Sequence, residues 1–271
     1  MPFRSVRTAR SARRSAAAVT AALTVAALGA AASPASAVKG GRPATTRARP
    51  YAMLIELDGS QFCGGTLVAP TKVLTAGHCV QNAGDVSALR VVGGRTEVDG
   101  SGGTVRKVAS YRLDSRYSMP GYAYDAAVLT LDRPMPYRTI PVAGPKDAAL
   151  VADGRRATVL GWGRTGPDTT ATRLKRAGLV LSPVADCEPY TDTDTDPAAM
   201  LCGMPRPGTT DSICPGDSGG PLVSGGKVVG IVSSGNKYCD EQFPVSVFVR
   251  TDSVAADLGL RTSPPTSGAR A

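Results

Sequence analysis

The chain has 271 residues, of which 42% are hydrophobic and 20% are charged, and its formal net charge is +9. Five of the positive charges are arginines within the first 14 residues, so the remainder of the chain carries only +4. No cluster of Lys and Arg is interleaved with aromatic residues, which argues against a nucleic-acid-binding protein.

Residues 1–37 have the three parts of a secretory signal peptide: a basic region, an Ala-rich apolar run from Ala16 to Ala32, and an Ala35-Ser36-Ala37 cleavage site. A membrane anchor is the alternative, but the apolar run is short for a span and no second one follows. We therefore expect a secreted protein with no membrane attachment after signal cleavage. The export route is left open.

Short runs rich in Val, Leu and Ile, bounded by turn-forming residues, predict antiparallel strands at 51–57, 71–76, 126–131, 156–162 and 227–234. Many short strands of this kind are typical of a sandwich or barrel. Residues 142–156 have a weaker strand pattern and could link two halves of the chain. Residues 252–260 predict a short closing helix, and the polar, Pro-rich segment 263–271 predicts a flexible tail.

All six cysteines follow the predicted cleavage site, and an even count in an exported chain predicts three disulfides. Zinc binding is the alternative, but the sequence has no C-x-x-C pair and only one histidine. The cysteines are Cys63, Cys79, Cys187, Cys202, Cys214 and Cys239.

The single histidine, His78, is the only imidazole that can act as an acid or base near neutral pH. A packed histidine with both nitrogens satisfied is the alternative, but a disulfide at Cys79 would hold the backbone beside it. Asp125 begins an apolar segment, where it is either an exposed turn residue or a buried carboxylate that orients an imidazole.

Ser218 lies in the segment Gly216-Asp217-Ser218-Gly219-Gly220, which is either a tight glycine turn or the site of a nucleophile. A serine hydroxyl needs a neighbouring base and backbone N–H groups aimed at the developing oxyanion. Glycines allow the sharp turn and the close approach of a substrate that such a site requires.

The segments LTAGHC, DAAVLTL and CPGDSGGPLV occur in this order, accompanied by CGGTLVAP, GWG and GIVSSG. From about Val38 to Leu260 the chain therefore resembles the trypsin/chymotrypsin-like serine endopeptidases. The resemblance implies an all-β fold of two packed six-stranded antiparallel barrels with a short C-terminal helix, the active site lying between the barrels. The expected barrels span 38–145 and 146–262.

The resemblance also assigns roles to individual residues. His78 resembles the general base, Asp125 the residue that orients it, and Ser218 the nucleophile. The N–H groups of Gly216 and Ser218 would form the oxyanion hole, and Ser233 would support Asp125. The implied disulfides are Cys63–Cys79, Cys187–Cys202 and Cys214–Cys239.

The resemblance further implies an activation step. Signal cleavage after Ala37 would expose Val38, whose amine would pair with Asp217 and order the oxyanion loop. Export would then itself produce the active enzyme, with no separate propeptide to remove. Lys39 departs from the small apolar residue that the family usually has at this position.

In the family that the chain resembles, the residue six positions before the catalytic serine lies at the base of the substrate pocket. Here that residue is Ser212, which indicates a neutral pocket for apolar side chains. If the loop bulges at Ile213, however, Asp211 would reach the pocket base and select Arg or Lys. Gly235 resembles an open pocket wall, and Ser233 is also expected among the pocket residues. The sequence leaves the choice between the two registers open and favours the neutral pocket.

The predicted function is a secreted, monomeric serine endopeptidase that acts on protein or peptide substrates through an acyl-enzyme intermediate. Protein protease inhibitors are a further class of partner. A catalytically silent binding protein of the same fold is the alternative. An esterase with a similar triad fits less well. Its serine lies in a turn between a strand and a helix, whereas Pro221 and a strand-like run follow Ser218, and its catalytic residues occur in the order Ser, acid, His. No cofactor or metal is expected, since Glu97 and Asp99 alone do not form a calcium loop.

Overall fold

The computed structural model describes residues 1, 3, 38–119, 121–192 and 194–262. The predicted signal peptide and the predicted tail lie almost entirely outside these residues. Among the described residues, no helix has the length and apolar character needed to cross a bilayer.

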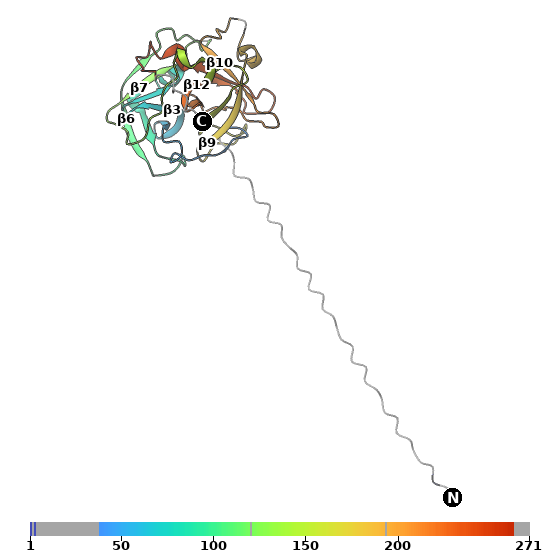
Figure 1. The fold of residues 1–271 in the computed structure, drawn as a ribbon. Helices are drawn as coiled ribbons and strands as arrows, with labels where there is room; N and C mark the ends of the chain where they lie inside the picture. The colour runs from blue at the N-terminus through green and yellow to red at the C-terminus, as the bar shows by residue number, and fades with distance from the viewer. Residues whose placement is uncertain (2, 4–37, 120, 193, 263–271) are drawn as a thin grey trace, which may run out of the picture. The chain divides into compact units, whose positions relative to one another are not determined.

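Six strands from the first half of the chain form a closed antiparallel barrel (blue to green in Figure 1) in the order β2-β3-β4-β7-β6-β5. Closure matters because it leaves no unpaired strand edge. The strands are β2 (Ala52–Leu57), β3 (Ser60–Ala69), β4 (Lys72–Thr75), β5 (Leu89–Gly93), β6 (Thr104–Leu113) and β7 (Ala127–Leu131).

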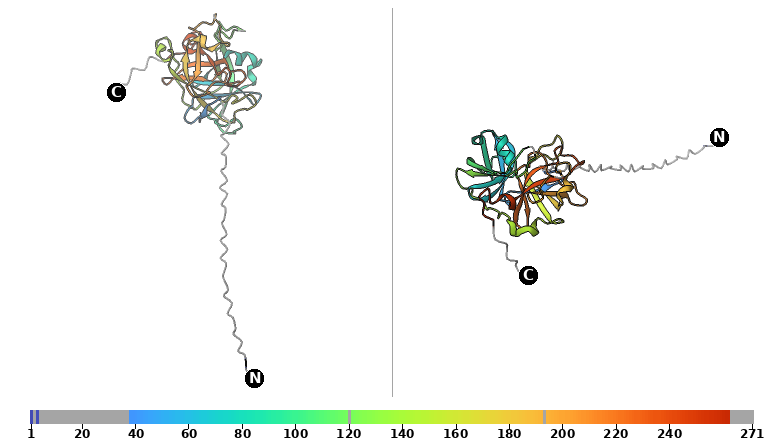
Figure 2. Two further views of the ribbon diagram at one scale, coloured as in Figure 1. Left: turned by 90° about the vertical axis from the view of Figure 1, so that its right-hand side faces the viewer. Right: turned by 90° about the horizontal axis from the view of Figure 1, so that it is seen from above.

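The second half of the chain forms another closed antiparallel barrel in the order β9-β10-β13-β12-β11-β8, and the pairing of β8 with β9 completes the ring. The two barrels lie side by side, as the right-hand view of Figure 2 shows. The strands are β8 (Arg156–Gly161), β9 (Lys175–Ser182), β10 (Met200–Pro205), β11 (Pro221–Ser224), β12 (Lys227–Gly235) and β13 (Ser246–Arg250). The prediction of two six-stranded barrels is confirmed.

Each barrel has its own apolar interior. In β9, Ala177, Leu179 and Leu181 are buried at alternate positions, as a strand with one face toward a core requires. Ile231 and Val249 come from the second barrel but belong to the apolar cluster of the first. The barrels are therefore joined by a continuous apolar contact, which holds the residues at their junction in fixed positions.

The N-terminal residues of the described chain pack on the second barrel. Val38 is fully buried in that barrel's apolar cluster. The short strand β1 (Arg42–Pro43) adds to the edge of β9. The first described segment thus crosses to the second barrel before the chain enters the first.

Helices are few and short. They are α1 (Gly77–Asn82) and α2 (Thr251–Val254), with three 3₁₀ turns, η1 (Val86–Ala88), η2 (Pro145–Leu150) and η3 (Val184–Cys187). The closing helix is shorter than the predicted 252–260: after Val254 the chain continues as turns, and Gly259 adopts a φ of 67°. The weak strand pattern of 142–156 corresponds to the 3₁₀ turn η2.

Three disulfides link the six cysteines in the pairs that the family resemblance implies, Cys63–Cys79, Cys187–Cys202 and Cys214–Cys239. They span 16, 15 and 25 residues along the chain. Closing a loop of about 15 residues stabilises a fold by about 3 kcal/mol in the chain-entropy model. The loop closed by Cys63–Cys79 contains His78, and the loop closed by Cys214–Cys239 contains Ser218. These two disulfides therefore also restrain the backbone at the two residues.

Candidate active site

The backbone at His78 is restrained by the residues around it. It is the second residue of α1, which begins directly after the buried end of β4, and the neighbouring Cys79 is tied to β3 by the disulfide. The His78 backbone N–H donates to Asp125 Oδ1 at 2.8 Å. The His78 side chain is only 12% exposed, and it lines the cavity that Ser218 also lines.

Asp125 is a completely buried carboxylate that precedes β7. Its Oδ2 lies 2.8 Å from His78 Nδ1 and accepts a hydrogen bond from Ser233 Oγ at 2.6 Å. An ionised carboxylate can only accept, so Nδ1 carries the hydrogen and Nε2 is left as a proton acceptor. This is the tautomer that a general base needs.

Ser218 lies in a turn whose backbone conformation requires glycine on both sides of it. Gly216 and Gly219 have φ angles of 95° and 79°, and a Cβ at Gly219 would lie 2.1 Å from Thr75 Oγ1. The Ser218 carbonyl accepts a hydrogen bond from Gly64 of the first barrel at 2.7 Å. Ser218 and His78 both line one cavity of about 430 Å³.

The backbone around Ser218 presents unused donors. Within the described chain, neither the Gly216 N–H nor the Ser218 N–H donates a hydrogen bond, although both residues are partly buried. The Gly216 carbonyl accepts from Gln61 Nε2 at 2.8 Å, which fixes the peptide plane that follows it. Two free N–H groups beside a serine can stabilise a negatively charged oxygen.

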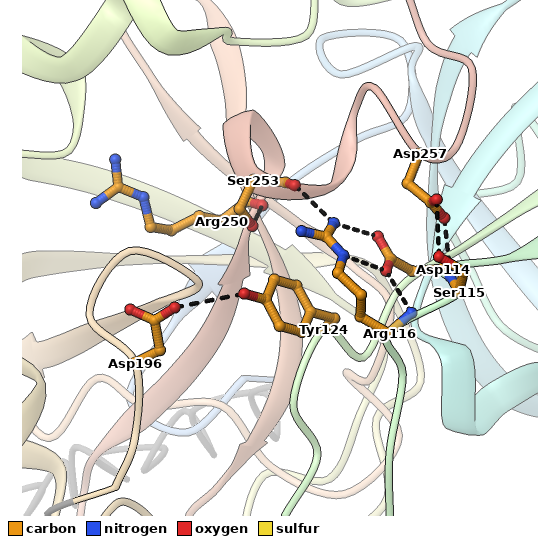
Figure 3. Close-up of polar contacts among 8 residues, drawn as sticks. All are labelled: Asp114, Ser115, Arg116, Tyr124, Asp196, Arg250, Ser253 and Asp257. Carbon is orange, nitrogen blue, oxygen red and sulfur yellow. Dashed lines mark hydrogen bonds and ion pairs between the residues drawn. The ribbon is translucent and has the colours of Figure 1, made fainter.

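The loop before Asp125 is secured by Arg116. Its guanidinium lies over the Tyr124 ring at 3.9 Å and forms a bidentate pair with the buried carboxylate of Asp114 (Figure 3). Tyr124 has a φ of 51°, which is strained for a bulky residue and needs support from its surroundings.

The same loop is bound to the C-terminal segment. Arg116 Nη2 donates to the Ser253 carbonyl at 2.8 Å, and Asp257 accepts from the N–H and Oγ of Ser115 at 2.8 and 2.9 Å (Figure 3). The hydrogen bond from the Ser115 backbone N–H, and to a smaller extent that from Ser115 Oγ, lowers the pKa of the Asp257 carboxyl. The conformation that presents Asp125 therefore depends on contacts far along the chain.

The surface of the cavity beside Ser218 is mainly apolar, although several polar side chains contribute to it. Gly235, Ser233 and Asn236 form part of its wall. Ser212 is fully buried and does not itself line the cavity, but its Oγ accepts from Asn236 Nδ2 at 3.0 Å. Ile213, Tyr122 and Tyr190 also line the cavity. None of these last three was identified from the sequence.

Asp211 does not line this cavity. Its Oδ2 accepts from the Gly178 N–H at 2.9 Å and lies 3.3 Å from Arg206 Nη2, on a different face of the second barrel. Every described residue that lines the cavity beside Ser218 lacks a carboxylate, and Lys237 adds a positive charge at its edge.

Asp217 is a fully buried acid next to the nucleophile. Its oxygens accept from the Gly163 and Cys214 N–H groups at 2.8 and 2.9 Å. Burial raises its pKa to about 7, even though these two hydrogen bonds act in the opposite direction. A cation placed beside this carboxylate would reverse that effect.

A metal centre is not supported by the described residues. The one group of three potential ligands among them is Cys63, His78 and Cys79, and both of these cysteines are in a disulfide. Glu97 is instead paired with Arg173 at 3.4 Å.

The chain matches the family model described as Trypsin over residues 38–257. It is 37% identical over 201 residues to "Trypsin" of Saccharopolyspora erythraea, covering 73% of this chain and 86% of that protein. It is 34% identical over 219 residues to "Granzyme M" of Homo sapiens, covering 78% and 84%. It is 32% identical over 213 residues to "Trypsin epsilon" of Drosophila erecta, covering 76% and 80%.

Proposed function

The chain belongs to the trypsin family and is a serine endopeptidase, and on this premise we propose that His78, Asp125 and Ser218 form its catalytic triad. The observation that carries the proposal is the hydrogen-bonded series from Ser233 through Asp125 to His78, which ends at the cavity that Ser218 also lines. The substrates are proteins or peptides.

The reaction begins when His78 Nε2 takes the proton of Ser218 Oγ as that oxygen attacks the scissile carbonyl carbon. The carbonyl oxygen becomes negatively charged and is stabilised by the Gly216 and Ser218 N–H groups. Asp125 stabilises the imidazolium and holds its orientation. The tetrahedral intermediate collapses as His78 protonates the departing amine, which leaves an acyl group on Ser218.

A water molecule then completes the cycle. His78 removes its proton as the water oxygen attacks the acyl carbon, and a second tetrahedral intermediate forms in the same oxyanion hole. The carboxylic acid product leaves when His78 returns the proton to Ser218 Oγ. Atoms and charges balance without a cofactor.

Peptide hydrolysis by the Val38-started chain tests this assignment. Ser218→Ala should reduce kcat by about 10⁴-fold or more, whereas Ser101→Ala, at an exposed loop position, should leave it unchanged. Equal activity of Ser218→Ala and the unaltered chain would reject the triad. A folded, Val38-started chain with no activity at all would instead favour the catalytically silent binding protein.

We propose that the primary specificity pocket is neutral and takes apolar side chains. Ser212 is satisfied by Asn236, Asp211 faces away, and Ile213 and Val232 supply apolar walls. An Arg or Lys side chain would enter without a buried carboxylate to pair with, which is costly. Peptides that differ only in this residue should be cleaved about 100-fold faster with Leu than with Arg, and the reverse order would contradict the proposal.

We propose that signal cleavage activates the exported enzyme. The observations that favour this are the complete burial of Val38 and of Asp217 and the absence of a described cation beside the Asp217 carboxyl. The Lys39 carbonyl accepts from the Ser212 N–H at 3.1 Å, so the segment that follows Val38 contacts the loop that carries Ser212 directly. The proposed enzyme is a secreted monomer, with protein protease inhibitors as a further class of partner.

A further inference from the structure

We propose that the second barrel carries a binding site for a tetrahedral oxyanion, sulfate or phosphate, formed by Arg42, Arg176 and Arg206. These three side chains line a cavity of about 120 Å³ together with Thr158, Ala177, Gly178 and Asp211. None of these residues lines the cavity beside Ser218. The site is therefore separate from the catalytic centre.

The pairing of β1 with β9 brings two like charges together. Arg42 lies directly opposite Arg176 in the antiparallel register, and both side chains face the same cavity. Like charges at directly opposed positions destabilise a strand pair. Within the described chain, neither guanidinium forms a hydrogen bond or an ion pair. An anion between them would turn this repulsion into two attractive contacts.

Arg206 supplies the third guanidinium, in a fixed position. Gly178 makes room for it, since a Cβ at that residue would lie 2.5 Å from Arg206 Nε. Arg206 Nη2 is 3.3 Å from Asp211 Oδ2, an oxygen that also accepts from the Gly178 N–H at 2.9 Å. Arg206 Nε is buried and has no acceptor within the described residues.

The charges at the cavity define the class of ligand. Three guanidinium groups face one carboxylate, Asp211, which is already engaged, so the site has a net charge of +2. A cation is excluded by this charge. Guanidinium groups bind oxyanions through paired N–H donors, and a tetrahedral sulfate or phosphate has enough oxygens to accept from all three.

An anion here would strengthen the attachment of the N-terminal segment. It would connect β1, through Arg42, to β9 and to the loop that carries Asp211. Gly40 packs closely against this loop, since a Cβ there would lie 2.8 Å from Asp211 Oδ1. The ligand would thus stabilise the residues that follow Val38 without touching the catalytic residues.

Isothermal titration calorimetry with sodium sulfate and with sodium phosphate, against sodium chloride at equal ionic strength, tests the site. The protein is the Val38-started chain with Ser218→Ala, which prevents self-digestion. We expect one saturable site for sulfate or phosphate, and a loss of affinity of about tenfold or more with Arg42→Gln and with Arg176→Gln. Arg133→Gln, which removes an exposed arginine from the first barrel, is the matched control.

Thermal unfolding gives a second readout. Saturating sulfate should raise the midpoint by about 2–4 °C more in the Arg133→Gln chain than in the Arg42→Gln or Arg176→Gln chain. Sulfate also stabilises proteins without binding to a site, so only the difference between variants counts. Both altered arginines are exposed, so these variants should fold. No saturable heat, or equal binding by all three variants, would overturn the proposal.

Discussion

Blocking the amine of Val38 should destabilise the protein in a pH-dependent way. The perturbation is a chain that keeps Ser36 and Ala37 in front of Val38, compared with a chain that begins at Val38. In the extended chain, the Asp217 carboxyl is fully buried with two N–H donors and no ammonium partner. In the Val38-started chain, we expect the new α-ammonium group to lie beside this carboxylate and supply the missing positive charge.

The magnitude follows from the pKa of Asp217. Burial raises it from 3.8 to about 7, so the folded extended chain binds the proton more tightly than the unfolded chain does. Stability is therefore greatest below pH 3.8 and falls as the pH rises to about 7, at about 1.4 kcal/mol per pH unit. The full loss is about 4 kcal/mol. We expect the ammonium group to remove this loss of stability in the Val38-started chain, because it would pair with the ionised carboxylate.

Urea unfolding at pH 5 and pH 8 measures the effect, with Ser218→Ala in both chains to prevent self-digestion. The single tryptophan, Trp162, is buried between Gly161 and Gly163, both of which lie against Asp217, and its fluorescence reports on this region. We expect the stability difference between the chains to grow by about 2–3 kcal/mol from pH 5 to pH 8. A difference that does not change with pH would refute the reasoning, and Asp217→Asn in the extended chain should abolish the change.

Other predictions concern single contacts of the site. Ser233→Ala removes the 2.6 Å hydrogen bond to Asp125 and should lower kcat/KM by about 10–100-fold, and an unchanged pH–rate profile and rate would contradict this role. Arg116→Gln removes the contact over Tyr124 and should lower kcat by about two- to tenfold with KM unchanged, while Arg250→Gln should not. Asp211→Asn should leave the Leu-over-Arg preference intact in peptide kinetics, whereas a collapse of that preference would place Asp211 in the pocket.

The candidate triad could be predicted from the sequence because the segments LTAGHC, DAAVLTL and CPGDSGGPLV, taken together and in this order, resemble one family. Taken separately, a lone histidine beside a cysteine, an acid at the start of an apolar strand and a serine among glycines each also allowed a purely structural interpretation. The structure brings His78, Asp125 and Ser218 to one place in the manner these contexts suggest. Their catalytic roles stay a prediction until they are measured.

The residues that line the cavity beside Ser218 were much harder to predict from the sequence. Tyr122 and Tyr190 reach it from loops whose paths depend on tertiary contacts, and nothing in their local sequence indicates a cavity. Asn236 satisfies Ser212 across 24 residues of chain, and the register of the loop that decides between Ser212 and Asp211 is fixed by Gly178 and Arg206. Loop registers of this kind depend on partners distant in the sequence.

The contacts that hold the loop before Asp125 could not be predicted from the sequence for the same reason. Arg116 and Tyr124 are eight residues apart, but the contacts that hold them extend to Ser253 and to Asp257 beyond it. The predicted strands were found where apolar residues cluster. The ends of β6, where most side chains are exposed, offered no such signal.

We propose above that Ser218 is an activated nucleophile in an enzyme that begins at Val38. Intact mass spectrometry of the secreted protein, with and without a fluorophosphonate probe, tests both parts at once. We predict a parent mass that starts at Val38 and one adduct, mapped to Ser218 and absent from Ser218→Ala. A folded chain that starts at Val38 and forms no adduct would contradict the assignment of Ser218 as an activated nucleophile.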